Sequence, residues 1–260
     1  GALRALRGEP RAPSGGGRIG EMVALGRWLR ANTPPTQGFF DAEARPEYSV
    51  LAMWGHGHVI RYEGRRAPVV DNFGDDVSPE NFAASIRYFG THREQEALAI
   101  LEQLGTRYVV VDPVNARLFA ESGARSMSHR LYRFDGSGLA RHRLIHELEG
   151  EATGAPPGTV PYKIFERVPG ARLRGRAAAG APITASLDFT TGRGRTGTLR
   201  WSTQAGPDGS WELVVPHATS NRGSIATAES YRLQAPGVTI NIGVSEAAVR
   251  QGSTLDVPPS

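Results

Sequence analysis

The sequence lacks several features that would assign it to a familiar class. It has no cysteine in 260 residues, which excludes disulfides and thiolate metal sites. No apolar run approaches the roughly 20 residues that a membrane-spanning helix needs, and no charged-then-apolar leader opens the chain. The chain begins with Gly1-Ala2 rather than methionine, so we expect a fragment of a longer protein.

Strong charge of either sign is also absent. The 30 basic and 26 acidic residues leave a formal net charge of +4, and Lys163 is the single lysine. The arginines are scattered and often adjoin acids, which argues against a nucleic-acid partner. Hydrophobic residues make up 39% and charged residues 22%, as in a folded globular protein. The 32 glycines and 18 prolines indicate many turns and argue against a helix bundle.

The order of the patterns predicts an α+β protein. We expect a flexible linker over residues 1–17, a mixed α/β domain with a partly parallel sheet over 18–168, and a small all-β sandwich or barrel over 169–250. Residues 251–260 are expected to form a loose tail.

Helical spacing and capping signals predict three helices in the first domain. They lie at Ile19–Leu29, from Ser78-Pro79 to Phe89, and from the capping box Thr91/Glu94 to Leu104. Apolar and β-branched runs predict strands in the same domain at 49–54, 68–71, 107–112, 131–134, 143–146 and 162–165.

Shorter, alternating segments fill the second domain. They predict strands at 183–189, 198–201, 211–215, 231–233 and 238–242. Asp208-Gly209 predicts a hairpin turn between two of them.

One segment carries a family resemblance. Residues 53–62 (MWGHGHVIRY) resemble the WWDYG signature of the oligosaccharyltransferase catalytic subunit, with Trp54 and Gly57 in place of its second tryptophan and its glycine. Residues 68–72, 107–112 and 162–171 resemble the segments that follow the signature, especially in archaeal members. The chain thus resembles the C-terminal domain of bacterial and archaeal members over about residues 18–245, in a diverged form.

The resemblance implies a function. The family transfers a lipid-linked oligosaccharide to the asparagine of an Asn-X-Ser/Thr sequon, and its soluble domain recognises the acceptor. The implied acceptor-binding residues here are Met53, Trp54, Gly55, His56, Gly57, Asp112 and Asn115. No catalytic or metal-binding residue is expected in this chain.

The remaining parts of the reaction are expected elsewhere. The implied divalent metal, Mg²⁺ or Mn²⁺, belongs to a membrane domain that this sequence does not include. The implied partners are that transmembrane domain, an acceptor polypeptide and the lipid-linked oligosaccharide. The implied location is the inner membrane, with this domain on its periplasmic side.

The signature departs from the family pattern where it contacts the acceptor. Gly55 replaces the aspartate and cannot accept a hydrogen bond from the sequon hydroxyl, and Met53 replaces the first tryptophan and offers only a weak thioether acceptor. In the second motif Asp112 is kept, but Asn115 stands where the family has lysine. Trp54 keeps its N–H donor, and His56 can both donate and accept. We therefore expect altered acceptor choice, or a non-catalytic homologue that binds glycan or protein.

Two histidines allow another interpretation. If residues 53–62 form a strand, His56 and His58 point to one face. A third ligand such as Asp71, Asp75 or Asp76 would complete a metal site. The alternative is a pair of hydrogen-bonded histidines near a loop.

Two further motifs have ordinary interpretations. Residues 192–197 (GRGRTG) match the dinucleotide-binding pattern, but they lie between predicted strands and no helix follows, so a hairpin loop is expected. Trp201 and Trp211 are expected in the core, with sugar stacking as the alternative.

Overall fold

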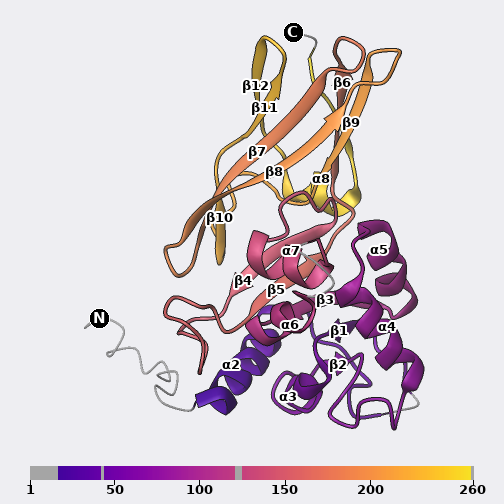
Figure 1. The fold of residues 1–260 in the computed structure, drawn as a ribbon, viewed down its shortest axis with the longest axis vertical. Helices are drawn as coiled ribbons and strands as arrows, with labels where there is room; N and C mark the ends of the chain where they lie inside the picture. Colours follow the sequence, from indigo (N-terminus) through magenta and orange to yellow (C-terminus); the bar gives the residue numbers. More distant parts are fainter. Residues whose placement is uncertain (1–16, 42–43, 121–124, 259–260) are drawn as a thin grey trace.

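The computed structural model describes residues 17–41, 44–120 and 125–258. A mixed α/β part forms the lower half of Figure 1, and a region of long strands stands above it. The predicted linker, residues 1–17, lies outside the described residues except for Gly17, which begins the first helix.

A five-stranded sheet organises the lower part, in the order β2-β1-β3-β5-β4. Its strands are β1 (Ser49–Leu51), β2 (Ala67–Pro68), β3 (Thr106–Val111), β4 (His142–Glu147) and β5 (Lys163–Arg167). β1 runs parallel to both β2 and β3, with Val50 opposite Tyr108, and the other pairs are antiparallel. This confirms the prediction of a partly parallel sheet.

Helices cover both faces of this sheet. They are α2 (Gly17–Asn32), α3 (Gly57–Tyr62), α4 (Pro79–Gly90), α5 (Glu94–Gln103), α6 (Pro113–Leu118) and α7 (Met127–Phe134). On one face Val50 and Val110 pack with Leu25 and Leu29 of α2. On the other face Val109 packs within the cluster formed by α4, α5 and α7. Burial on both faces explains why β3 is almost continuously apolar.

One of the predicted strands is too long and another is wrong. The strand predicted at 49–54 ends at Leu51, and the chain turns at once into a 3-10 turn, Trp54–His56, and then α3. The segment 131–134 belongs to helix α7, because the Ser126 hydroxyl accepts the N–H of His129 and caps that helix. Met127 and Leu131, four residues apart, are both fully buried.

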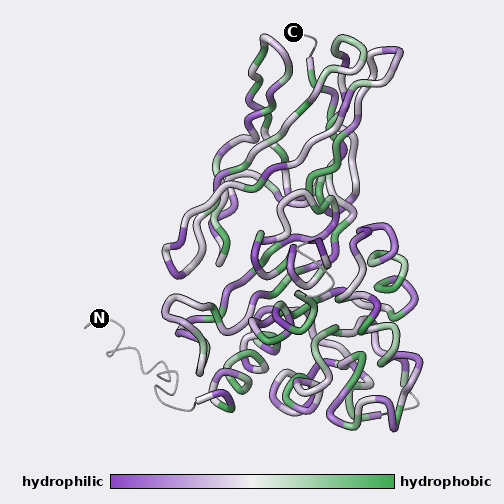
Figure 2. The backbone as a smooth tube through the Cα atoms, viewed as in Figure 1, coloured by the Kyte–Doolittle hydropathy of each residue, from purple (hydrophilic) through white to green (hydrophobic). Residues whose placement is uncertain are grey.

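The upper part is a sandwich of two sheets. One contains β8 (Thr196–Gln204), β7 (Pro182–Thr191), β11 (Tyr231–Ala235), β12 (Val238–Ile242) and β10 (Ile225–Thr227). The other contains β13 (Thr254–Asp256), β6 (Ala171–Arg176) and β9 (Ser210–Val215), and α8 (Glu246–Gln251) precedes β13. Hydrophobic and hydrophilic residues alternate along these strands in Figure 2, as expected of a sheet with one buried face.

Two details of the upper part differ from expectation. Asp208-Gly209 does form a turn, but β8 and β9 on either side of it pair with β7 and β6 in different sheets, so it is not a hairpin. Residues 254–256, predicted as part of a loose tail, form β13 and pair in parallel with β6.

The two parts share one core and several polar links. A single hydrophobic cluster contains Val109 and Phe165 of the lower sheet and Leu187 and Trp201 of the upper one. The Trp201 indole N–H donates to the carbonyl of Leu139 at 2.7 Å. None of the helices in the described ranges is long and apolar enough to cross a bilayer.

Candidate functional site

A short turn at the carboxyl end of β1 carries the candidate acceptor residues. Trp54 begins the turn, and 36% of its surface is exposed. Its ring meets Phe82 of α4 edge-on at 5.6 Å. The turn therefore holds an indole outward against one fixed neighbour.

The other end of the same turn points inward. His56 is buried, and its Nδ1 lies 3.2 Å from the carbonyl oxygen of Met53. Its Nε2 lies 3.1 Å from the Tyr162 hydroxyl and 3.4 Å from a carboxylate oxygen of Asp112. Burial lowers the pKa of His56, while the charge of Asp112 opposes that shift. Burial likewise raises the pKa of the Tyr162 hydroxyl.

Asp112 and Asn115 are fixed by the start of α6. Asp112 caps this helix, and its second carboxylate oxygen accepts the backbone N–H of Asn115 at 2.7 Å. The Asn115 side chain is fully buried, and its oxygen accepts a hydrogen bond from Ser128. The structure thus brings Asp112 to His56, while Asn115 faces the protein interior.

Two more of the predicted site residues, Met53 and Gly57, are buried and contribute to packing. Met53 is buried in the core cluster. A Cβ on Gly57 would lie 2.3 Å from the Cα of Asp71, so only glycine allows this close approach of the two backbones. A Cβ on Gly55, by contrast, would meet no atom within 4 Å. The aspartate position of the signature is therefore open space.

The paired-histidine interpretation is wrong in its geometry. His56 ends the 3-10 turn and His58 lies in α3, so the two do not alternate along a strand. His56 faces Tyr162, whereas the His58 ring contacts Tyr62 and Phe73. Asp71 is paired with Arg61 at 3.2 Å. Over the described part of the chain, no three histidine or carboxylate side chains are arranged to hold a metal ion.

A group of exposed aromatic side chains lies next to the turn, on α3 and on two loops. Phe40, Tyr62 and Phe73 are each more than half exposed. Phe40 contacts Tyr62, and His58 contacts both Tyr62 and Phe73, so the rings form a connected surface. We call Phe40, Tyr62, His58 and Phe73 the aromatic surface. Asn72 joins it to the turn, since its side chain accepts from the N–H of His58 and donates to the carbonyl of Gly55.

Sequence reasoning missed Tyr162 and the helix after Asp112. Tyr162 lies 106 residues after His56, and no local pattern connects them. The helix had a signal, since Asp112-Pro113 combines an N-cap residue with proline at the first helical position.

The remaining sequence motifs are structural. Residues 192–195 form the turn between β7 and β8, which confirms a hairpin loop. Arg193 donates to the carbonyls of Leu148 and Gly150, and Arg195 pairs with Asp135 and Glu147. Trp201 is buried in the core.

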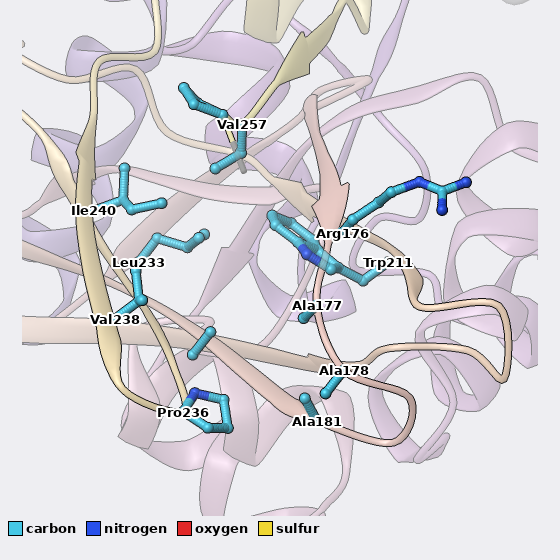
Figure 3. Close-up of a pocket in the computed structure, with 12 residues that line it drawn as sticks. Arg176, Ala177, Ala178, Ala181, Trp211, Leu233, Pro236, Val238, Ile240 and Val257 are labelled. Atoms are coloured by element: carbon cyan, nitrogen blue, oxygen red, sulfur yellow. The ribbon is translucent and has the colours of Figure 1, made fainter. Parts of the chain in front are cut away.

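Trp211 lies between the two upper sheets. It lines a pocket of about 90 Å³ with Leu233, Ile240 and Val257, and Arg176 lies beside it (Figure 3). Its ring lies directly over Gly175, where a Cβ would be 2.6 Å away. The indole is 6% exposed, so it does not present an open stacking surface for a sugar.

Comparison with known proteins places this geometry in a family. Residues 21–116 match the AglB core domain, and residues 170–255 match the archaeal glycosylation protein B long peripheral domain. The chain belongs to the oligosaccharyltransferase family. The first match contains the Trp54 turn and Asp112, and the second contains the upper sandwich.

Similar proteins from Archaeoglobus fulgidus agree with this family. Dolichyl-phosphooligosaccharide-protein glycotransferase 3 is 19% identical over an alignment covering 88% of this chain and 41% of its own length. The oligosaccharyltransferase AglB in complex with an inhibitory peptide and a dolichol-phosphate superposes with a TM-score of 0.74 and 18% identity, over 91% of this chain and 42% of that one.

A further structure from the same organism is an oligosaccharyltransferase tethered to an acceptor peptide containing the NVT sequon. It superposes with a TM-score of 0.75 and 18% identity, over 91% of this chain and 43% of that chain. These similarities establish a shared fold. The chain spans less than half the length of each of these three proteins.

Proposed function

We propose that this chain recognises the acceptor polypeptide for an oligosaccharyltransferase that transfers a lipid-linked oligosaccharide to protein asparagine. The observation that carries the proposal is the partly exposed position of Trp54 at the start of a turn whose end is fixed in the protein. The carboxyl end of the turn that carries this indole is fixed by the contacts of His56 with Asp112 and Tyr162 and by the close approach of the next residue, Gly57, to Asp71. An exposed indole held in one orientation can donate a hydrogen bond at little entropic cost.

The other components of the reaction belong to a membrane domain outside this sequence. In this proposal that domain supplies the divalent metal, Mg²⁺ or Mn²⁺, and binds the lipid-linked oligosaccharide. The chain lies on the extracytoplasmic side and meets the membrane domain through the aromatic surface. Two observations support this contact: the aromatic side chains are exposed, and Asn72 connects them directly to the Trp54 turn.

The acceptor site differs from the family signature in its hydrogen-bonding groups. Gly55 provides no carboxylate, and Met53 is buried in the core, so Trp54 is the outward donor of the turn. A site without a carboxylate discriminates less strongly for a hydroxyl than one that contains it. We therefore propose a relaxed preference for serine or threonine in the acceptor.

Peptide titration followed by NMR tests the proposal. An Asn-X-Thr peptide should perturb the Trp54 indole signal and bind more tightly than its Asn-X-Ala counterpart. Trp54→Phe removes the N–H and should abolish this difference, whereas Phe134→Leu, at an exposed position on α7, should leave it unchanged. Equal affinity of wild type for both peptides would refute acceptor recognition by this turn.

Restoring the missing carboxylate gives the complementary result. Because a Cβ at Gly55 meets no neighbour, Gly55→Asp fits the fold. A hydrogen bond to a charged group is worth about 1.5–3 kcal/mol, so the Asn-X-Thr peptide should bind roughly tenfold or more tightly. Gly55→Asn is the uncharged control and should give a smaller gain. No gain with aspartate would show that the peptide hydroxyl lies elsewhere.

A second candidate function is a non-catalytic binding module. The absence of a carboxylate at Gly55 favours it, because the family site loses its strongest acceptor there. In that case the titration would show a ligand on the aromatic surface or the upper sandwich and no effect of the sequon hydroxyl.

A further inference from the structure

One long side of the upper sandwich is closed, and the opposite side is open. On the closed side β8 leads into β9 through a short turn, and these two strands lie side by side. On the open side β12 and β13 are the outermost strands of the two sheets, and within the described chain no pairing joins them. The pocket that contains Trp211 lies in this gap, with Val238 and Ile240 of β12 facing Val257 across it (Figure 3). The hydrophobic interior of the sandwich therefore reaches the surface here.

The inward-facing side chains of β12 are less covered than those of its neighbour. Val238, Ile240 and Ile242 are each only partly buried. Tyr231 and Leu233, on the adjacent strand β11, are fully buried. β11 has a strand on both sides, β7 and β12, whereas β12 pairs with β11 alone. This difference in burial is expected where a sheet could accept one more strand.

The free edge of β12 carries unpaired backbone groups. β11 and β12 are joined by the two-residue turn Pro236-Gly237, so Ala235 and Val238 form a hydrogen-bonded pair. Bonded and non-bonded pairs alternate along an antiparallel ladder, so the N–H and C=O groups of Thr239 and Asn241 point away from β11. Both residues are exposed, and in the described part of the chain no backbone hydrogen bond reaches them from outside the sheet.

The edge also lacks the features that usually prevent pairing with another chain. Edge strands commonly carry a charged residue, a proline or a bulge. Over its described length β12 has none of these, since its sequence is Val-Thr-Ile-Asn-Ile and its register with β11 is regular. No residue from 233 to 245 is charged. The β11–β12 hairpin lies at the outside of the upper part in Figure 1, so the edge is open to a partner.

A second copy of β12 has the matching chemistry. Antiparallel pairing centred on Ile240 places Thr239 opposite Asn241 of the second copy, where the two residues can exchange both N–H···O=C bonds. The same register places Val238 opposite Ile242 of the second copy, so the apolar side chains of both copies lie on the pocket side. Because neither strand is charged, no like charges meet across the contact. The pairing is symmetric about a two-fold axis, as in most homo-oligomers.

We propose that this chain forms a two-fold symmetric dimer in which the β12 strands of the two copies pair antiparallel and cover the open side of the sandwich. The contact lies on the upper sandwich, whereas the Trp54 turn lies in the lower part of the molecule (Figure 1). The dimer therefore does not rest on the proposed acceptor recognition, and neither proposal depends on the other.

Sedimentation equilibrium of the whole chain tests the dimer. With rising concentration the mass should increase from one chain to two and no further, because a two-fold contact closes on itself. Hydrogen exchange should show the amides of Thr239 and Asn241 protected in the dimer and unprotected after dilution to the monomer. The mass of one chain up to the solubility limit overturns the proposal. If a valine-threonine repeat peptide then shifts the NMR signals of those amides, the edge serves a different chain.

Charge substitutions test the register. Thr239→Glu with Asn241→Glu places like charges opposite each other across the contact and should weaken the dimer by roughly tenfold or more. Thr239→Lys with Asn241→Glu places each lysine opposite a glutamate of the second copy and should restore the dimer. In both variants the glutamate at position 241 lies opposite Arg232 of β11 in its own chain. The two variants should therefore fold equally well, which circular dichroism checks.

A matched control excludes a general charge effect. Ser202→Glu with Gln204→Glu adds the same charge at exposed positions on β8, at the other side of the same sheet, and should leave the dimer unchanged. Equal weakening by this control, or no recovery with the lysine–glutamate variant, overturns the proposal. Trp54→Phe should still form the dimer, so the failure of one proposal is distinguishable from that of the other.

Discussion

At the scale of single residues, two neighbouring glycines differ in the space around them: Gly57 is tightly packed and Gly55 is not. A Cβ on Gly57 would lie 2.3 Å from Asp71 Cα and 2.5 Å from the carbonyl oxygen of Val70, and both are backbone atoms that cannot rotate away. Gly55, two residues earlier, has empty space around the same position. The glycine of the family signature is thus required by packing, whereas the position of its aspartate is sterically free.

Alanine substitution at these two positions gives a matched test. Gly57→Ala forces the 55–60 segment away from residues 70–71, and overpacking of this kind costs about 1–3 kcal/mol of unfolding free energy. Gly55→Ala introduces no clash and should change stability by less than about 0.5 kcal/mol. Urea unfolding of the two variants measures both values. Similar losses for the two would contradict the close approach seen here.

The residues of the candidate site are only partly predictable from the sequence. Trp54 and Asp112 are identified by the resemblance of residues 53–62 and 107–112 to the family motifs, and each follows a strand of the lower sheet. The inward direction of Asn115 depends on its contact with Ser128 of α7, and the contact of His56 with Tyr162 depends on how β5 pairs with β3; no local pattern encodes either. Long-range packing therefore decided which predicted residues meet.

At the scale of elements, the errors fall where local patterns fit two structures. Leu131-Tyr132-Arg133-Phe134 alternates like a strand, but Met127 and Leu131 also fit a helix, and the Ser126 cap selects it. The sequence predicts the Asp208-Gly209 turn correctly. It does not show that the two flanking strands, β8 and β9, pair with β7 and β6 in different sheets, since these partners are distant from the turn in the chain. By contrast β3, with its run of buried β-branched residues, was predictable because it is apolar on both faces.

Strand β5 carries a buried carboxylate that links four elements. Glu166 contacts Arg107 of β3 and Arg143 of β4, at 2.9 and 2.6 Å, and Arg250 of α8 at 2.7 Å. Burial alone would raise its pKa, but hydrogen bonds and charge from the arginines lower it to about 2. The folded-state pKa thus lies below the ordinary value of 4.5.

This shift predicts the direction of the acid response. Because the folded pKa is the lower one, the stabilisation is fully present above about pH 4.5 and is lost as the pH falls toward 2. The contribution is on the order of 3 kcal/mol. Glu166→Gln should lower stability at pH 7 and flatten its decline between pH 4.5 and 2, as measured by urea unfolding across pH. An unchanged slope would assign acid unfolding to other carboxylates.

At the scale of the whole molecule, the two parts matched by separate family models are physically one body. The same hydrophobic cluster runs through both, and Arg250 and Glu246 of α8 reach Glu166 and Arg143 of the lower sheet. The shared hydrophobic core, together with ion pairs to the buried side chains of Glu166 and Arg143, makes it costly to open one part while the other stays folded. We therefore expect one cooperative unit rather than a rigid domain with a loosely attached accessory module.

Native-state hydrogen exchange tests this expectation. Amides of β3 below and β7 above should exchange with the same free energy of opening. Trp201→Phe removes the indole N–H that donates to Leu139, leaving a buried carbonyl without its partner, and should lower both values together by about 1–3 kcal/mol.

Trp211→Phe is the control. That indole is equally buried but lies between the two upper sheets and not against Leu139, so the loss of stability should be smaller. Exchange of β7 at a distinctly lower free energy than β3 would show that the upper sandwich opens independently. The Trp54 turn and the upper sandwich would then belong to separately unfolding units.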